Sequence, residues 1–143
     1  MLTIALLWLG LTLTAEAPRT GCERCHLQLP AEAARRHVVD WQSSAHAAHA
    51  VSCVRCHDGD PASEVEGDAH RFVRSSRLGT SPTHPTQLPQ TCGGCHPRQS
   101  TGFTTSRHGA LLAANADGAP SCASCHGAMR AEVPDPAGLE TTC

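Results

Sequence analysis

One pattern occurs four times along this 143-residue chain: two cysteines separated by two residues and followed at once by a histidine. The copies are CERCH at 22–26, CVRCH at 53–57, CGGCH at 92–96 and CASCH at 122–126. They contain eight of the nine cysteines, namely Cys22, Cys25, Cys53, Cys56, Cys92, Cys95, Cys122 and Cys125. A disulfide framework needs no histidine after each cysteine pair. Because only ten residues are histidine, one after all four pairs would arise by chance about once in tens of thousands of cases.

Covalent attachment of haem c requires this combination. Two thiols three positions apart can each form a thioether with a vinyl group of one haem, and the next residue can then coordinate the iron from below the ring. Zinc, a redox dithiol or an iron–sulfur cluster would also use paired cysteines, but none of them needs a histidine at this position. The pattern therefore predicts four haem c groups, with zinc and iron–sulfur as the alternatives. The proximal iron ligands are His26, His57, His96 and His126.

The composition agrees with an interior built from cofactors. The chain has two Phe, two Trp and no Tyr, although aromatic side chains normally supply much of the buried area of a core. Four haems could supply that apolar interior instead, with the chain wrapped around them and unfolded without them. We expect a mainly α fold with extensive irregular loops and little or no sheet, packed around haem. Helices are expected within 27–50 and 97–115, and 58–90 should be a loop with one short helix over about 70–77.

The N-terminus predicts export. An apolar run over residues 2–13 is followed by Ala15-Glu16-Ala17, and this is the length and cleavage pattern of a signal peptide. Residues 1–17 are therefore assigned to a signal peptide, with a retained N-terminal anchor as the alternative, and 18–143 to one haem-binding domain. The expected location is periplasmic, with membrane anchoring left open. No basic run of the nucleic-acid-binding type is present.

Six histidines remain as candidates for the second axial position on iron: His37, His46, His49, His70, His84 and His108. An internal repeat separates two of them from the rest. The segments WQSSAH at 41–46 and FTTSRH at 103–108 share an aromatic residue, then Ser, then His, and each lies between two haem motifs. His46 and His108 are therefore the best distal candidates.

With these segments, the sequence resembles the periplasmic multihaem c-type cytochromes, a group that runs from tetrahaem carriers to octahaem oxidoreductases. The resemblance rests on W-x-x-S-x-H before CVRCHDGDP, on AHRF at 69–72, and on F-x-x-S-x-H-G before CASCHG. It implies that His46, His108 and His70 are distal iron ligands.

The last motif departs from the pattern of that group. It often continues as C-H-G-x-H, whereas Met129 stands at that position here. Met129 and His84 are alternatives for the fourth distal ligand, because methionine also ligates haem iron. His49 and His37 remain further options, although His37 follows two arginines and is expected to be solvated.

Electron transfer is the function that the haem motifs favour. Closely spaced, six-coordinate haems carry electrons without a substrate pocket. The implied partners are redox proteins of an exported respiratory chain, such as a membrane quinol-oxidising component or a terminal reductase. The alternative is the electron-input part of a larger multihaem enzyme acting on small nitrogen or sulfur compounds. The chain contains no Lys and so lacks the C-x-x-C-K motif of one such reductase family.

The ninth cysteine, Cys143, ends the sequence. Each motif begins after small or polar residues, and Glu140-Thr141-Thr142 precede Cys143 in the same way. We expect Cys143 to begin a fifth motif and haem site in a longer chain, against a free or intermolecular thiol as the alternative.

Overall fold

Helices are the only regular secondary structure in residues 20–139, the part of the chain that the computed structural model describes. About 53 % of these residues are helical, so the predicted mainly α class is confirmed. The elements in order are α1 (Gly21–Gln28), α2 (Glu32–Gln42), α3 (Ala45–Ala48), α4 (Val54–His57), α5 (Glu66–Ala69), the 3-10 helix η1 (Pro85–Gln87), α6 (Leu88–Gly93), α7 (Pro97–Thr104), α8 (Arg107–Ala113), α9 (Cys122–His126) and α10 (Pro136–Leu139).

The start of α1 shows how a short helix is held by its own sequence. The main-chain N–H of Thr20 donates to the Glu23 carboxylate at 3.1 Å, which satisfies a donor that a helix start would leave free. Glu23 is buried, and its other carboxylate oxygen accepts from the Gln42 amide at 3.3 Å. One side chain therefore caps α1 and ties it to the end of α2.

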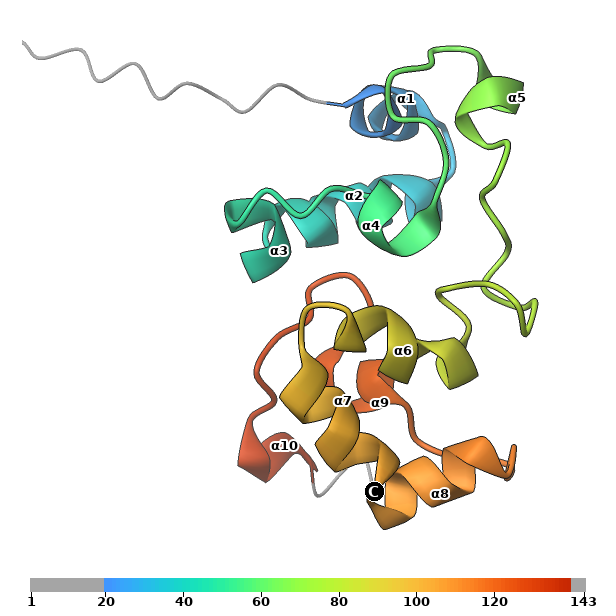
Figure 1. Ribbon diagram of the computed structural model, residues 1–143. Helices are drawn as coiled ribbons and strands as arrows, with labels where there is room; N and C mark the ends of the chain where they lie inside the picture. The colour runs from blue at the N-terminus through green and yellow to red at the C-terminus, as the bar shows by residue number, and fades with distance from the viewer. Residues whose placement is uncertain (1–19, 140–143) are drawn as a thin grey trace, which may run out of the picture.

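The helices form two groups that follow the chain order. In Figure 1, α1–α4 occupy the upper part and α6–α10 the lower part, and the segment after α5 descends along one side to join them. The principal helix packing is within each group: α2 contacts α1 and α3, while α6 contacts α7, α9 and η1. An ion pair between Arg130 and Asp40 at 3.3 Å joins the two groups.

Little apolar side-chain surface is buried within the polypeptide. In the part of the chain that the structure describes, the buried core consists of Val38 in α2 and Leu112 in α8. Other large apolar side chains are exposed, among them Phe72 at 65 % and Val39 at 52 %. Because hydrophobic burial is the main favourable term in folding, the polypeptide supplies only a small part of the interior that a stable domain needs.

Two of the predicted helical regions occur, each divided in two. Residues 27–50 contain α2 and α3, and 97–115 contain α7 and α8. The predicted helix over 70–77 is wrong, because α5 ends at Ala69 and residues 71–80 form exposed turns. Ser75 explains this, since its hydroxyl accepts from the Arg77 N–H at 3.3 Å and such local bonds compete with a helix.

The predicted signal peptide over 1–17 and the terminal Cys143 lie outside the described residues. Within residues 20–139, each helix is too short or too polar to cross a bilayer.

Candidate functional site

Each cysteine–histidine motif lies on a short helix or at its end. The first, second and fourth motifs are on α1, α4 and α9. The third motif runs from α6 to the start of α7. The second cysteine and the histidine follow the first cysteine by three and four positions. On a helix, residues at these spacings are neighbours on the same side. In the middle two motifs the histidine N–H donates to the carbonyl of the first cysteine, at 3.0 Å for His57 and Cys53 and at 2.8 Å for His96 and Cys92. The backbone thus directs two thiols and an imidazole toward one side, as haem attachment requires.

All eight motif cysteines are free of disulfides, and their thiols lie close to those of neighbouring motifs. Burial raises the pKa of the Cys53 thiol to about 11, and the nearby Cys22 adds to this shift. Burial also raises the pKa of Cys92 to about 11, with further contributions from Cys122 and then Cys56. The first motif therefore adjoins the second, the second the third, and the third the fourth.

His26 of the first motif faces His70, which follows α5. Their ring centroids are 6.0 Å apart and their planes are inclined by 57°. An imidazole nitrogen binds a transition metal at about 2 Å and lies about 1 Å from its ring centre, so two imidazoles on opposite sides of one metal have centroids roughly 6 Å apart. Any inclination is compatible, because each ring can turn about its metal–nitrogen bond. The pair fits the spacing of two axial ligands.

His96 of the third motif faces His46 of α3 in the same manner. The two ring centroids are 6.2 Å apart and the planes are inclined by 50°. Here the rings come from different helix groups, since α3 belongs to the first group and the third motif to the second. A second motif histidine thus meets a non-motif histidine at the spacing of an axial pair.

Within residues 20–139, no three His, Cys, Asp or Glu side chains converge as ligands for a bare metal ion.

The repeated aromatic–Ser–His segments have one local structure. Ser44 and Ser106 are the N-cap residues of α3 and α8, and their hydroxyls accept from the N–H of Ala47 at 3.3 Å and of Gly109 at 3.2 Å. Each histidine is therefore the second residue of its helix. The aromatic residue is the last but one residue of the preceding helix, and Ser begins the next helix so that His lies in its first turn.

His57 of the second motif lies close to His37 of α2. Burial lowers the pKa of His57, the positive charge of His37 lowers it further, and Asp58 partly offsets both. Burial also lowers the pKa of His26, and His70 and His37 add to that effect. His37 is exposed, as the sequence predicted, but it also lies near two proximal histidines.

A contact of Trp41, together with helix register, accounts for the position of His37. Trp41 donates its indole N–H to the carbonyl of Val51 at 2.9 Å, two residues before the second motif. His37 is four residues before Trp41 on α2, so both side chains are on the same side of the helix. That register directs His37 toward the second motif.

His126 of the fourth motif is oriented by a main-chain acceptor. Its Nδ1 lies 2.9 Å from the carbonyl oxygen of Glu132. A carbonyl can only accept, so Nδ1 carries the proton and Nε2 keeps a lone pair. Metal-binding histidines commonly have such a partner, and this arrangement leaves Nε2 as the nitrogen of His126 that could bind a metal.

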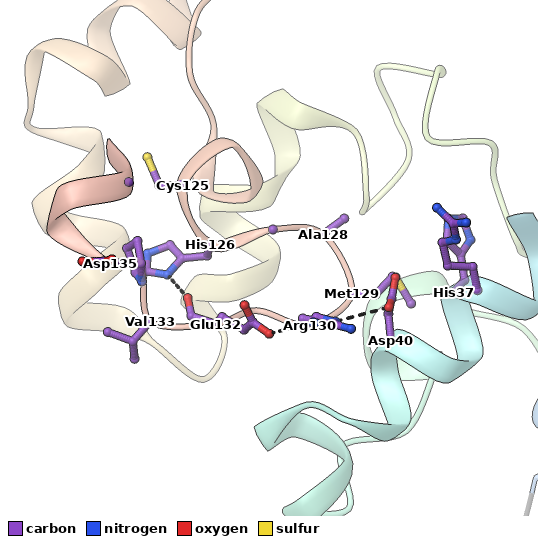
Figure 2. A pocket seen from close by; sticks show the side chains of 14 residues that line it. His37, Asp40, Cys125, His126, Ala128, Met129, Arg130, Glu132, Val133 and Asp135 are labelled. Atoms are coloured by element: carbon purple, nitrogen blue, oxygen red, sulfur yellow. Dashed lines mark hydrogen bonds and ion pairs between the residues drawn. The ribbon is translucent and has the colours of Figure 1, made fainter. Parts of the chain in front are cut away.

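A cavity of about 600 Å³ lies between α2 and the segment that follows α9. Cys125 and His126 line one end, and Figure 2 shows Met129 beside Asp40 and His37 at the other end. Arg130 lies between these ends and bonds to both Asp40 and Glu132. Met129 and His37 thus line the same cavity, and Figure 2 shows Met129 away from the His126 ring.

The other predicted distal residues form neither of these two ring contacts. His108 in α8 and His49 after α3 are exposed. His84 caps η1: its Nδ1 accepts from the Thr86 N–H at 3.3 Å and lies 2.7 Å from the Thr86 hydroxyl. With Nδ1 accepting, the proton of the neutral ring is on Nε2, so His84 would have to release that proton or its cap bond before Nε2 could bind iron.

The chain was compared with known families and proteins. No family model, no curated protein and no solved structure matches it.

Proposed function

We propose that this chain is a multihaem c-type cytochrome that carries four covalently attached haem c groups and transfers electrons. The observation that supports it best is the pair of ring contacts at 6.0 and 6.2 Å, each between a motif histidine and a histidine outside the motifs. The spacing is that of two imidazoles on one iron, and it occurs at two separate motifs.

The residues divide the work as follows. The two thiols of each motif would hold one haem through thioether bonds, formed by addition of each S–H across a vinyl group without net oxidation. At the first and third motifs, the motif histidine and the nearby His70 or His46 would be the residues that hold the iron. A haem iron held in this way supplies reversible one-electron transfer between the ferric and ferrous states.

Two further properties support an electron carrier. Thiols of consecutive motifs lie close to one another, so the four motifs adjoin in chain order. Haems attached to them would be close enough to pass electrons from one to the next. The ring pairs would fill both axial positions of two irons, and a filled iron has no position for a substrate. The apolar run over residues 2–13 followed by Ala15-Glu16-Ala17 supports the further proposal of an exported, periplasmic protein, with other redox proteins of a respiratory chain as its partners.

The proposal is tested on the protein produced in a host that attaches haem c. We expect the intact mass to include four haem increments and alkylation to leave the eight motif cysteines unmodified. The double variant Cys53→Ala/Cys56→Ala should lose one increment and keep three. A colourless protein in which all eight motif cysteines react with the alkylating reagent would refute the proposal, and bound zinc or an iron–sulfur cluster would support the alternative metal sites.

A further inference from the structure

In the part of the chain that the structure describes, helices of one group pack only slightly on helices of the other. The main helix packing lies within each group, α2 with α1 and α3 in the first and α6 with α7 and α9 in the second. The Arg130–Asp40 ion pair joins them, but both partners reach solvent, with exposed side-chain fractions of 54 % and 29 %. Exposed ion pairs of this kind contribute little to stability.

The pair formed by His46 and His96 also crosses between the groups. Their centroids are 6.2 Å apart, and both rings have their positions set locally. On one side, Ser44 caps α3 and accepts from Ala47 at 3.3 Å, which puts His46 in the first turn. On the other, the His96 N–H donates to the Cys92 carbonyl at 2.8 Å.

We infer that His46 is the distal ligand of the iron attached through Cys92 and Cys95, and that this iron joins the two helix groups of the chain. The inference rests on the proposed function and adds to it which histidine serves which haem. Cys92 and Cys95 hold the haem to the second group by covalent bonds, and His46 holds its iron to the first. The chain between them, residues 71–80, is exposed throughout, and the coordinate bond adds a strong link across the junction beside the proximity of Cys56 to Cys95 and the Arg130–Asp40 ion pair.

The proposed bond between His46 and the iron can be tested by cleaving the chain within residues 71–80, which connect the two helix groups. A recognition site for a sequence-specific protease is inserted between Ser76 and Arg77, in exposed turns that should tolerate insertion. The four-haem protein is cleaved and passed over a size-exclusion column without denaturant. We expect the two fragments, each carrying two haems, to elute together. In His46→Ala they should elute separately, since the coordinate bond is gone.

Two control variants isolate the role of His46. His49→Ala changes an exposed histidine three residues further on, and Arg130→Ala removes the ion pair between the groups. Fragments of both variants should stay together. Added imidazole gives a further readout, because in His46→Ala it should return the five-coordinate iron to the low-spin state while the fragments remain apart.

The spectra of the separated fragments locate the iron. In His46→Ala the new high-spin ferric signal should accompany the fragment that begins at Arg77, and the fragment ending at Ser76 should keep the spectrum it has in the cleaved parent protein. High-spin signal in the fragment ending at Ser76, separation of the fragments without any His46 substitution, or an unchanged low-spin spectrum in His46→Ala would each overturn the assignment. A four-haem protein with one of these results would still satisfy the proposed function, whereas a haem-free protein would fail it.

Discussion

The hydroxyl of Ser106 donates a hydrogen bond of 2.6 Å to the main-chain carbonyl of Phe103, and Ser44 forms the same bond of 2.6 Å with Trp41. Both hydroxyls also accept an N–H from the helix that follows. One side chain thus ends a helix and begins the next, and this places a histidine at the same helical position in both repeats.

Loss of either serine hydroxyl should weaken the protein. In Ser44→Ala and Ser106→Ala we expect the free energy of unfolding to fall by about 1 kcal/mol each, the usual value of an N-cap. Denaturant titration of the haem-loaded protein measures this. Ser43→Ala and Thr105→Ala are matched controls at the neighbouring positions, where exposed hydroxyls bond back to a carbonyl, and should change stability by less than about 0.5 kcal/mol. Equal effects at all four positions would contradict the capping role.

Two glycines on adjacent helices should respond oppositely to alanine. A Cβ at Gly109 would lie 2.7 Å from the Thr104 Cα and 2.9 Å from the Thr104 carbonyl oxygen, so α8 would have to move away from the end of α7. At Gly102, inside α7, a Cβ meets nothing within 4 Å. Gly109→Ala should lower the midpoint of thermal unfolding, while Gly102→Ala should stabilise the helix by about 1 kcal/mol. A stabilised Gly109→Ala would show that the close approach is absent.

The residue after the motif histidine differs between the second and fourth motifs. Asp58 has φ 60° and ψ −161°, a region that is nearly restricted to glycine, and Gly127 has φ 73° and ψ 165° at the matching position. We expect Asp58→Gly to stabilise the protein by about 1–3 kcal/mol through release of this strain. Gly127→Ala should destabilise it, although its Cβ would meet no atom within 4 Å.

Asp58→Asn separates strain from charge, because it removes the carboxylate and keeps a side chain. It should leave the free energy of unfolding closer to that of the parent than to that of Asp58→Gly. If Asn and Gly stabilise equally in a denaturant titration, charge rather than backbone conformation is the cause.

On the proposed function, removal of His70 should leave one haem iron without its second histidine ligand. In His70→Ala we expect one of the haems to change from a low-spin to a high-spin ferric spectrum, and added imidazole to reverse the change. His49→Ala, an exposed histidine outside the ring pairs, should leave the electron paramagnetic resonance spectrum unchanged. An unaltered spectrum in His70→Ala would show that His26 has a different partner on iron.

Acid should destabilise the folded protein. With no metal bound, burial lowers the pKa of both His26 and His57 below the ordinary value of 6.5, so the unfolded chain binds more protons as the pH falls through that value. The free energy of unfolding should therefore decrease from about pH 8 to about pH 5, and iron ligation acts in the same direction because only neutral imidazole binds metal. Denaturant titrations across this range measure the slope. His49→Ala should keep it, and a stability that rises toward acid would contradict the lowered pKa values.

Local features were predictable because they depend on neighbouring residues. The motifs at 22–26 and 122–126 place Cys, Cys and His within single helical turns, whose geometry follows from spacing alone. The two aromatic–Ser–His segments predicted a repeat, and Ser44 and Ser106 have equivalent bonds in the structure. The helix expected over 70–77 was wrong because the side chain of Ser75 offered the backbone a competing bond.

The sequence by itself determined the mainly α class, the four Cys-x-x-Cys-His groups and the two histidine positions that follow Ser44 and Ser106. Only the tertiary structure decided which rings meet: His70 lies by His26, and His46 by His96. Helix spacing acts over a few residues and is encoded locally, whereas these pairs join residues 44 and 50 positions apart. Their meeting depends on how α3, α5 and the motif helices pack, and no short-range pattern contains that information.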